Sequence, residues 1–249
     1  MDGVTWLLWI AAFAVGLSKG GLPSVGMLAV PILALVMSPV KAAVLLLPIY
    51  LISDVVGVSL YRRNFSKPNL IILIPAGVLG VLIGWATATM ISDQAIALLI
   101  GLLGIGFCFK TWFYTGKDQK AKPANPVKGL LWGAASGFTS FISHAGAPPY
   151  QIYMLPQRLS KLEFAGTTVI VFAVINLAKI VPYQDMRPYS FDDIEITMFL
   201  IPFALAGTIA GAFLTRWIRE TWFFLGVQIS LFVVSVKLVV SAAMTINVL

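Results

Sequence analysis

Two basic side chains stand beside glycines and prolines inside stretches of sequence that are otherwise apolar. One is in "SKGGLP" (residues 18–23) and the other in "SHAGAP" (residues 143–148). Glycine and proline interrupt a helix and leave backbone N–H groups unpaired, and a short helix that follows points its positive end at them. Such donors, with a cation and serine hydroxyls nearby, suit an anion that has several acceptor oxygens. We therefore expect an anion-binding site formed by Lys19, His144, Ser18, Gly20, Gly21, Ser143, Gly146, Tyr150, Gln151 and Asn176.

A structural role is the alternative for each of these side chains. A cation deep in a membrane span costs about 2.5–3.5 kcal/mol on insertion scales, so a functional role is the default for such groups. Lys19 can instead extend toward the membrane surface, and His144 can simply pack. His144 is also a candidate proton carrier, because histidine titrates near physiological pH. Tyr150 and Gln151, which follow the second interruption, either line the site or pack against its walls.

Two further ionisable residues, Asp54 and Lys179, lie within apolar runs. Asp54 is about two thirds of the way along residues 42–60, and Asn176 holds the matching place in the second half of the chain. A buried carboxylate can carry a coupling proton, or it can be the counter-ion of Lys19 or Lys179. The sequence leaves both interpretations open.

The composition indicates the environment of these residues. The chain has 249 residues, of which 59% are hydrophobic and only 11% are charged, whereas soluble domains are about 25% charged. Nearly uncharged windows of about 18 residues or more predict membrane-spanning helices, and a β-barrel would show short alternating segments instead. We therefore expect an all-α polytopic membrane protein with spans near residues 42–60, 70–90, 95–114, 164–182, 194–214 and 222–245.

The positions of the positive charges indicate on which side of the membrane each loop lies. The net charge of +7 is concentrated in short loops between the expected spans, so we do not expect nucleic-acid binding. The basic loops at residues 61–69 and 116–128 belong on the cytoplasmic side, and the acidic loop at 183–195 belongs outside. This alternation requires residues 4–37 and 129–156 each to return to the side from which they start, as short-helix pairs or re-entrant hairpins. Both termini are then external to the cytoplasmic membrane.

The chain also contains a weak internal repeat, divided by a polar linker. We expect an N-terminal repeat at residues 1–114, a cytoplasmic linker at 115–128 and a C-terminal repeat at 129–249. Each half has one short-helix pair followed by three spans, which makes about eight membrane segments, or up to ten if the short helices are counted separately. Because each half crosses the membrane three times, an odd number, the second half is inverted relative to the first. Inverted repeats with broken helices are typical of secondary transporters. The matched pairs are Ser18 with Ser143, Lys19 with His144, Gly21 with Gly146, Pro23 with Pro148, Asp54 with Asn176, Tyr61 with Tyr183, Pro75 with Pro202, Gly80 with Gly207, and Gly84 with Gly211.

Two stretches resemble a known family. "GLSKGGLPSVGMLAVPIL" and "GFTSFISHAGAPPYQIYMLPQRLSKLEFAGTTVIVFAVINLAKIVPY" look like the two halves of the sulfite exporter TauE/SafE family, also called the toluene sulfonate uptake permease family. The resemblance covers nearly the whole chain. It implies a carrier of sulfur-containing anions, including sulfite and small organosulfonates, with roughly eight membrane segments in two inverted repeats.

Together these features predict a secondary transporter of sulfite or a C2/C3 organosulfonate, which works by alternating access around a cationic centre. Export is implied by the family name alone, and proton coupling stays open. The alternatives are an anion channel and a carrier of a carboxylate or another oxyanion. We do not expect an enzyme, because a single histidine has no acidic partner near it in the sequence. One cysteine and one histidine cannot form a metal cluster, and no cofactor is expected. The oligomeric state is not predicted.

Overall fold

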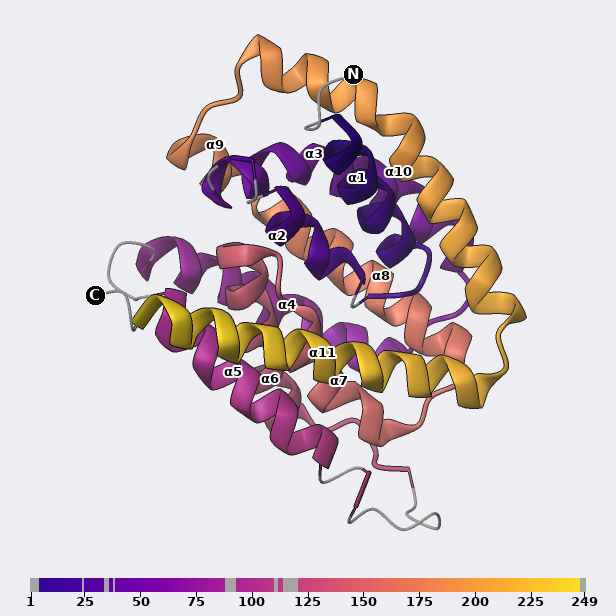
Figure 1. Cartoon of the computed structure of the whole chain (residues 1–249). Coiled ribbons are helices and arrows are strands. Elements are labelled where there is room, and N and C mark those ends of the chain that lie inside the picture. Colours follow the sequence, from indigo (N-terminus) through magenta and orange to yellow (C-terminus); the bar gives the residue numbers. More distant parts are fainter. Residues whose placement is uncertain are drawn as a thin grey trace.

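The chain is helical throughout the part that the structure describes. The computed structural model describes residues 5–23, 25–33, 36–37, 39–87, 93–109, 112–113 and 121–246, and these ranges contain no strand. Five of the described helices are long and apolar enough to cross a membrane, which confirms an all-helical, multi-pass protein (Figure 1). They are α3 (Pro39–Tyr61), α4 (Lys67–Thr87), α8 (Lys161–Ala178), α10 (Phe191–Trp217) and α11 (Glu220–Ile246).

The sixth expected span, at residues 95–114, coincides with helix α5 (Asp93–Phe109). Its 17 residues make a helix of about 25 Å, slightly less than the hydrocarbon core of about 30 Å. Residues 110–111 and 114 of the expected span lie outside the described residues.

Both interrupted segments fold back on themselves. Helix α1 (Thr5–Lys19) is followed by a turn, by η1 (Val25–Leu28) and by α2 (Ala29–Leu33), and it packs against both. The chain reverses at Gly21, whose φ of 113° is a conformation that glycine adopts without strain. The broken first segment that the sequence predicts is therefore a helical hairpin.

The second interrupted segment has the same form. Helix α6 (Pro126–Ser143) packs against α7 (Ala147–Met154), which leads into η3 (Leu155–Gln157). The start and the end of this hairpin are joined, because the Lys122 N–H donates to the Pro156 carbonyl at 3.1 Å. The two ends of this segment therefore lie next to each other.

Helices α3 and α8 pack against each other in the middle of the bundle (Figure 1). In each of these two helices, 56% of the apolar membrane-spanning segment is buried inside the protein. The corresponding share is 28–39% in α4, α10 and α11. Around this central pair, α1 packs against α10, α4 against α6, and α5 against α11. Outer helices expose large apolar side chains such as Ile71 and Met198, which is the surface that lipid requires.

Glycines permit the closest of these helix contacts. A Cβ atom at Gly80 on α4 would overlap the carbonyl oxygen of Ala134 on α6, and one at Gly207 on α10 would overlap that of Phe13 on α1. Membrane helices gain much of their association from close backbone approach at small residues. The glycines at these positions therefore hold the outer helices against the two hairpins.

We predict that Gly80→Ala destabilises the protein by about 1–3 kcal/mol, because the new methyl group forces α4 away from α6. The measurement is thermal unfolding in detergent. Gly106→Ala on α5 is the matched control, since a Cβ there has no neighbour within 4 Å. Equal melting temperatures for the two variants would contradict the proposed contact.

Candidate functional site

The two hairpins bring their turns to the middle of the central helix pair. Lys19 is the last residue of α1 and His144 caps the C-terminus of α6, and both are buried, with exposed fractions of 4% and 7%. The Lys19 Nζ lies 2.8 Å from Asp54 Oδ1 on α3. Lys19 does not extend to the membrane surface, so that alternative is wrong.

A hydrogen-bonded cluster links this ion pair to the second hairpin. The Asn176 side-chain amide on α8 donates to Asp54 Oδ2 at 2.7 Å. The Lys179 Nζ donates to Asn176 Oδ1 at 3.1 Å and lies 3.1 Å from His144 Nδ1. We call these five residues, Lys19, Asp54, Asn176, Lys179 and His144, the central cluster. The sequence predicted all five, and the structure joins them in one continuous network.

Donor and acceptor rules fix much of the protonation of the central cluster. His144 Nε2 lies 3.0 Å from the Ala43 carbonyl, which can only accept, so this nitrogen carries a proton. Nδ1 then accepts from the Lys179 ammonium. Two lysine side chains and one imidazole therefore surround the single carboxylate of Asp54, so basic groups outnumber acidic groups in the central cluster.

A proline in α3 frees one backbone carbonyl near the central cluster. Pro48 has no N–H, so the Val44 carbonyl loses its helical partner and the helix is distorted at this turn. The Tyr189 hydroxyl donates to that carbonyl at 2.9 Å, and the neighbouring Ala43 carbonyl accepts from His144. Freed carbonyls inside a membrane must find such partners. The contact between Nε2 and the Ala43 carbonyl thus fixes the ring orientation of His144.

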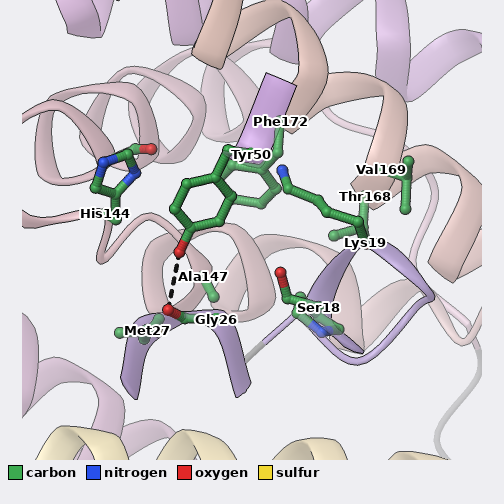
Figure 2. Close-up of a pocket in the computed structure, with 12 residues that line it drawn as sticks. Ser18, Lys19, Gly26, Met27, Tyr50, His144, Ala147, Thr168, Val169 and Phe172 are labelled. Carbon is green, nitrogen blue, oxygen red and sulfur yellow. Dashed lines mark hydrogen bonds between the residues drawn. The ribbon is translucent and has the colours of Figure 1, made fainter. Parts of the chain in front are cut away.

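Aromatic rings enclose the Lys19 ammonium (Figure 2). It lies 5.0 Å from the ring centroid of Tyr50 and 5.8 Å from that of Phe172, within the range of cation–π attraction. The ring of His144 stacks on the ring of Tyr50, and their centroids are 4.5 Å apart. The Tyr50 hydroxyl donates to the Gly26 carbonyl at 2.8 Å. Sequence reasoning missed both aromatic residues. Their separation of 122 positions equals that of Asp54 and Asn176, a signal that could have found them.

A small cavity opens beside the Lys19 side chain (Figure 2). Its volume is about 30 Å³, enough for about two water molecules. Three of the predicted residues line it, and three hydroxyl-bearing residues outside the prediction line it as well. The lining consists of Ser18, Lys19, Pro23, Gly26, Met27, Tyr50, Ser140, His144, Ala147, Thr168, Val169 and Phe172. In the part of the chain that the structure describes, no three His, Cys, Asp or Glu side chains come together to hold a metal ion.

The other predicted ligands surround the cavity without lining it. Tyr150 is fully buried, and its hydroxyl lies 3.0 Å from that of the lining residue Thr168. The Gly146 carbonyl accepts from Ser136 at 2.8 Å, and the Gly20 carbonyl accepts from Tyr61 at 2.6 Å. Direct contact between these groups and a substrate stays a prediction. The same applies to Gly21 and Ser143 at the turns, to Gln151, which is buried on α7, and to Asn176 in the central cluster.

We predict that Lys19→Met destabilises the protein by about 3–5 kcal/mol, because it leaves the Asp54 carboxylate buried without its ion-pair partner. The double variant Lys19→Met with Asp54→Asn removes both charges and regains much of this loss. Thermal unfolding of the single and double variants in detergent measures the coupling. Additive effects of the two substitutions would contradict a direct interaction.

Comparison with known proteins assigns the chain to a family. Comparisons with curated proteins and with solved structures find no match. The family described as "Sulfite exporter TauE/SafE" matches residues 8–238, which is nearly the whole chain. Its members are membrane transporters and not enzymes. The broken helices, the buried cationic cluster and this match lead to one conclusion: the chain belongs to the sulfite exporter TauE/SafE family of multi-pass membrane transporters.

Proposed function

We propose that this protein is a secondary transporter of a small sulfur-containing anion, sulfite or a C2/C3 organosulfonate, in the cytoplasmic membrane. The observation that carries the proposal is the buried central cluster, in which three basic side chains meet one carboxylate, next to a cavity lined by Lys19 where the two hairpins meet. In a low-dielectric interior a net charge attracts an opposite charge strongly. The family supplies the sulfur-containing class of substrate, and its description implies export.

The lining of the cavity supports recognition of an oxyanion. Lys19 contributes a basic group, and Ser18, Ser140 and Thr168 contribute hydroxyls. Ser18 and Thr168 donate to the Val15 and Phe164 carbonyls, so these two hydroxyls must rotate to donate to an anion. Such groups match an anion whose charge is spread over several oxygens. A carboxylate would meet the same groups, so a carrier of carboxylates is the second candidate, and a substrate screen decides between them.

We also propose that the protein consists of two inverted repeats, residues 1–114 and 129–249, which move relative to each other during transport. The helix contacts support this division, because they are reciprocal. Helix α1 of the first half packs against α10 of the second, and α6, which corresponds to α1, packs against α4, which corresponds to α10. Helices α3 and α8, which correspond to each other, pack together.

Side-chain contacts repeat in the same way. Tyr61 donates to the carbonyl of Gly20 at the end of α1, and Tyr183 donates to the carbonyl of Phe141 near the end of α6, both at 2.6 Å. Asp54 contacts Asn176, its equivalent in the other half. Equivalent residues in direct contact lie close to the axis that relates the two halves. The central cluster therefore sits where the repeats meet, the usual place for a substrate in such transporters.

We predict that Lys19→Gln lowers sulfite transport in proteoliposomes by at least about tenfold, because the cavity loses the basic side chain that would pair with the anion. Lys67→Gln, which removes an exposed lysine, is the control and should transport at the parental rate. Trans-stimulation by sulfite on the far side indicates a carrier, whereas an open channel shows none. Parental flux through Lys19→Gln would exclude Lys19 from the substrate site.

We predict that both termini face the outside of the cytoplasmic membrane, because each half makes three crossings besides its hairpin. A reporter enzyme that works only outside the cytoplasm should be active when fused to the C-terminus. Activity of the same reporter fused within residues 116–128, but not at the C-terminus, would contradict this topology.

A further inference from the structure

The cation that faces the cavity already has a partner. The Lys19 ammonium lies 2.8 Å from Asp54 Oδ1, and both side chains are about 5% exposed. Figure 2 shows this ammonium beside the rings of Tyr50 and Phe172. An anion that enters the cavity must compete with a carboxylate for the same positive charge. Whatever neutralises Asp54 therefore strengthens anion binding.

We propose that a proton on Asp54 and an anion on Lys19 bind together, so that the transporter carries one proton with each monovalent anion. This inference rests on the proposed function. A proton from water adds to the Asp54 carboxylate and replaces Lys19 as the group that neutralises it. Lys19 is then free to turn into the cavity and pair with the anion. Asn176 remains bonded to Oδ2, since a protonated carboxyl keeps an oxygen that accepts.

The surroundings of Asp54 single it out as the proton acceptor. The charged groups that face it are Lys19 from α1 and Lys179 from the end of α8. Tyr50 lies one turn away on its own helix, and His144 holds its Nε2 proton against the Ala43 carbonyl and presents Nδ1 to Lys179. Helix α2 has no ionisable residue, and the charged residues of α10, Asp192, Asp193, Glu195 and Arg216, lie near its ends. Asp54 is thus the one carboxylate among the described groups of this cluster.

The charge balance fixes the direction of coupling. A proton and a monovalent anion together add no net charge, so the loaded cluster has the same charge as the empty one. The two ligands promote each other's binding, because coupling between sites is reciprocal. They therefore cross the membrane in the same direction. An inward proton gradient drives uptake of the anion, and export requires an outward anion gradient.

Calorimetry on the purified full-length protein in detergent tests this coupling, with methanesulfonate as the probe. Methanesulfonate stays ionised between pH 5 and pH 8, so it contributes no proton itself. Titrations in two buffers of different ionisation enthalpy give the number of protons taken up. We expect the uptake to approach one proton per anion in the pH range where Asp54 is ionised before the anion binds. The affinity there should fall by up to about tenfold for each unit of rising pH.

Three variants locate the proton. Asp54→Asn should bind methanesulfonate without proton uptake and with an affinity that does not change with pH. Asp185→Asn, which neutralises an exposed carboxylate, is the matched control and should behave like the parent. His144→Gln weakens binding but retains proton uptake. Uptake that persists in Asp54→Asn and disappears in His144→Gln would assign the proton to His144 and overturn the proposal.

The remaining outcomes separate this inference from the proposed function. Anion binding by the parent with no proton uptake, or with proton release, overturns the coupling and leaves an anion transporter. A parent protein that binds neither methanesulfonate nor sulfite at any pH overturns the proposed function, and the coupling with it.

Discussion

A lysine and an aspartate buried together in a membrane protein can keep their charges only by staying paired, and the Lys19–Asp54 pair imposes this constraint on the fold. Helix α1 must end where the lysine reaches α3. The backbone of α1 must also approach α3 closely, because a Cβ at Gly57 would lie 2.7 Å from the Lys19 carbonyl. The turn at Gly21 then reverses the chain. The broken helix is therefore the means by which a cation reaches the middle of the bundle.

In the proposed repeat, the second half differs from the first at the central cluster. At the offset of 122 that relates Asp54 to Asn176, the counterpart of Gly57 is Lys179. Thus the second half has an amide where the first has a carboxylate, and a lysine where the first has a glycine. This difference adds a second lysine to the central cluster without a second carboxylate.

Much of this site could be predicted from the sequence, because its residues violate the apolar composition around them. Lys19, Asp54, His144 and Lys179 stand out in runs that otherwise lack charge, and glycines and prolines mark the turns. The sequence could not choose between a counter-ion and a proton carrier for Asp54, because this choice depends on a distance between two helices. The geometry is that of a counter-ion, and the coupling inferred above lets one carboxylate serve both roles in turn.

Other features lay beyond the sequence because they depend on tertiary partners. Pro48 predicts a distortion of α3, but not that His144 and Tyr189 bind the carbonyls near it. Tyr50 and Phe172 resemble ordinary apolar residues of a span until their rings are seen beside Lys19. The spans themselves were predictable, since a run of apolar residues of sufficient length has few other uses in a helical protein.

The location of a bound anion tests the central claim most directly. Selenite has selenium in place of the sulfur of sulfite, and anomalous diffraction from a crystal grown with selenite locates that atom. The account predicts a selenium peak in the cavity, in contact with the Lys19 ammonium and with the hydroxyls that line it. A well-occupied peak elsewhere in the protein, with the Lys19–Asp54 pair intact and the cavity free of selenium, would contradict it.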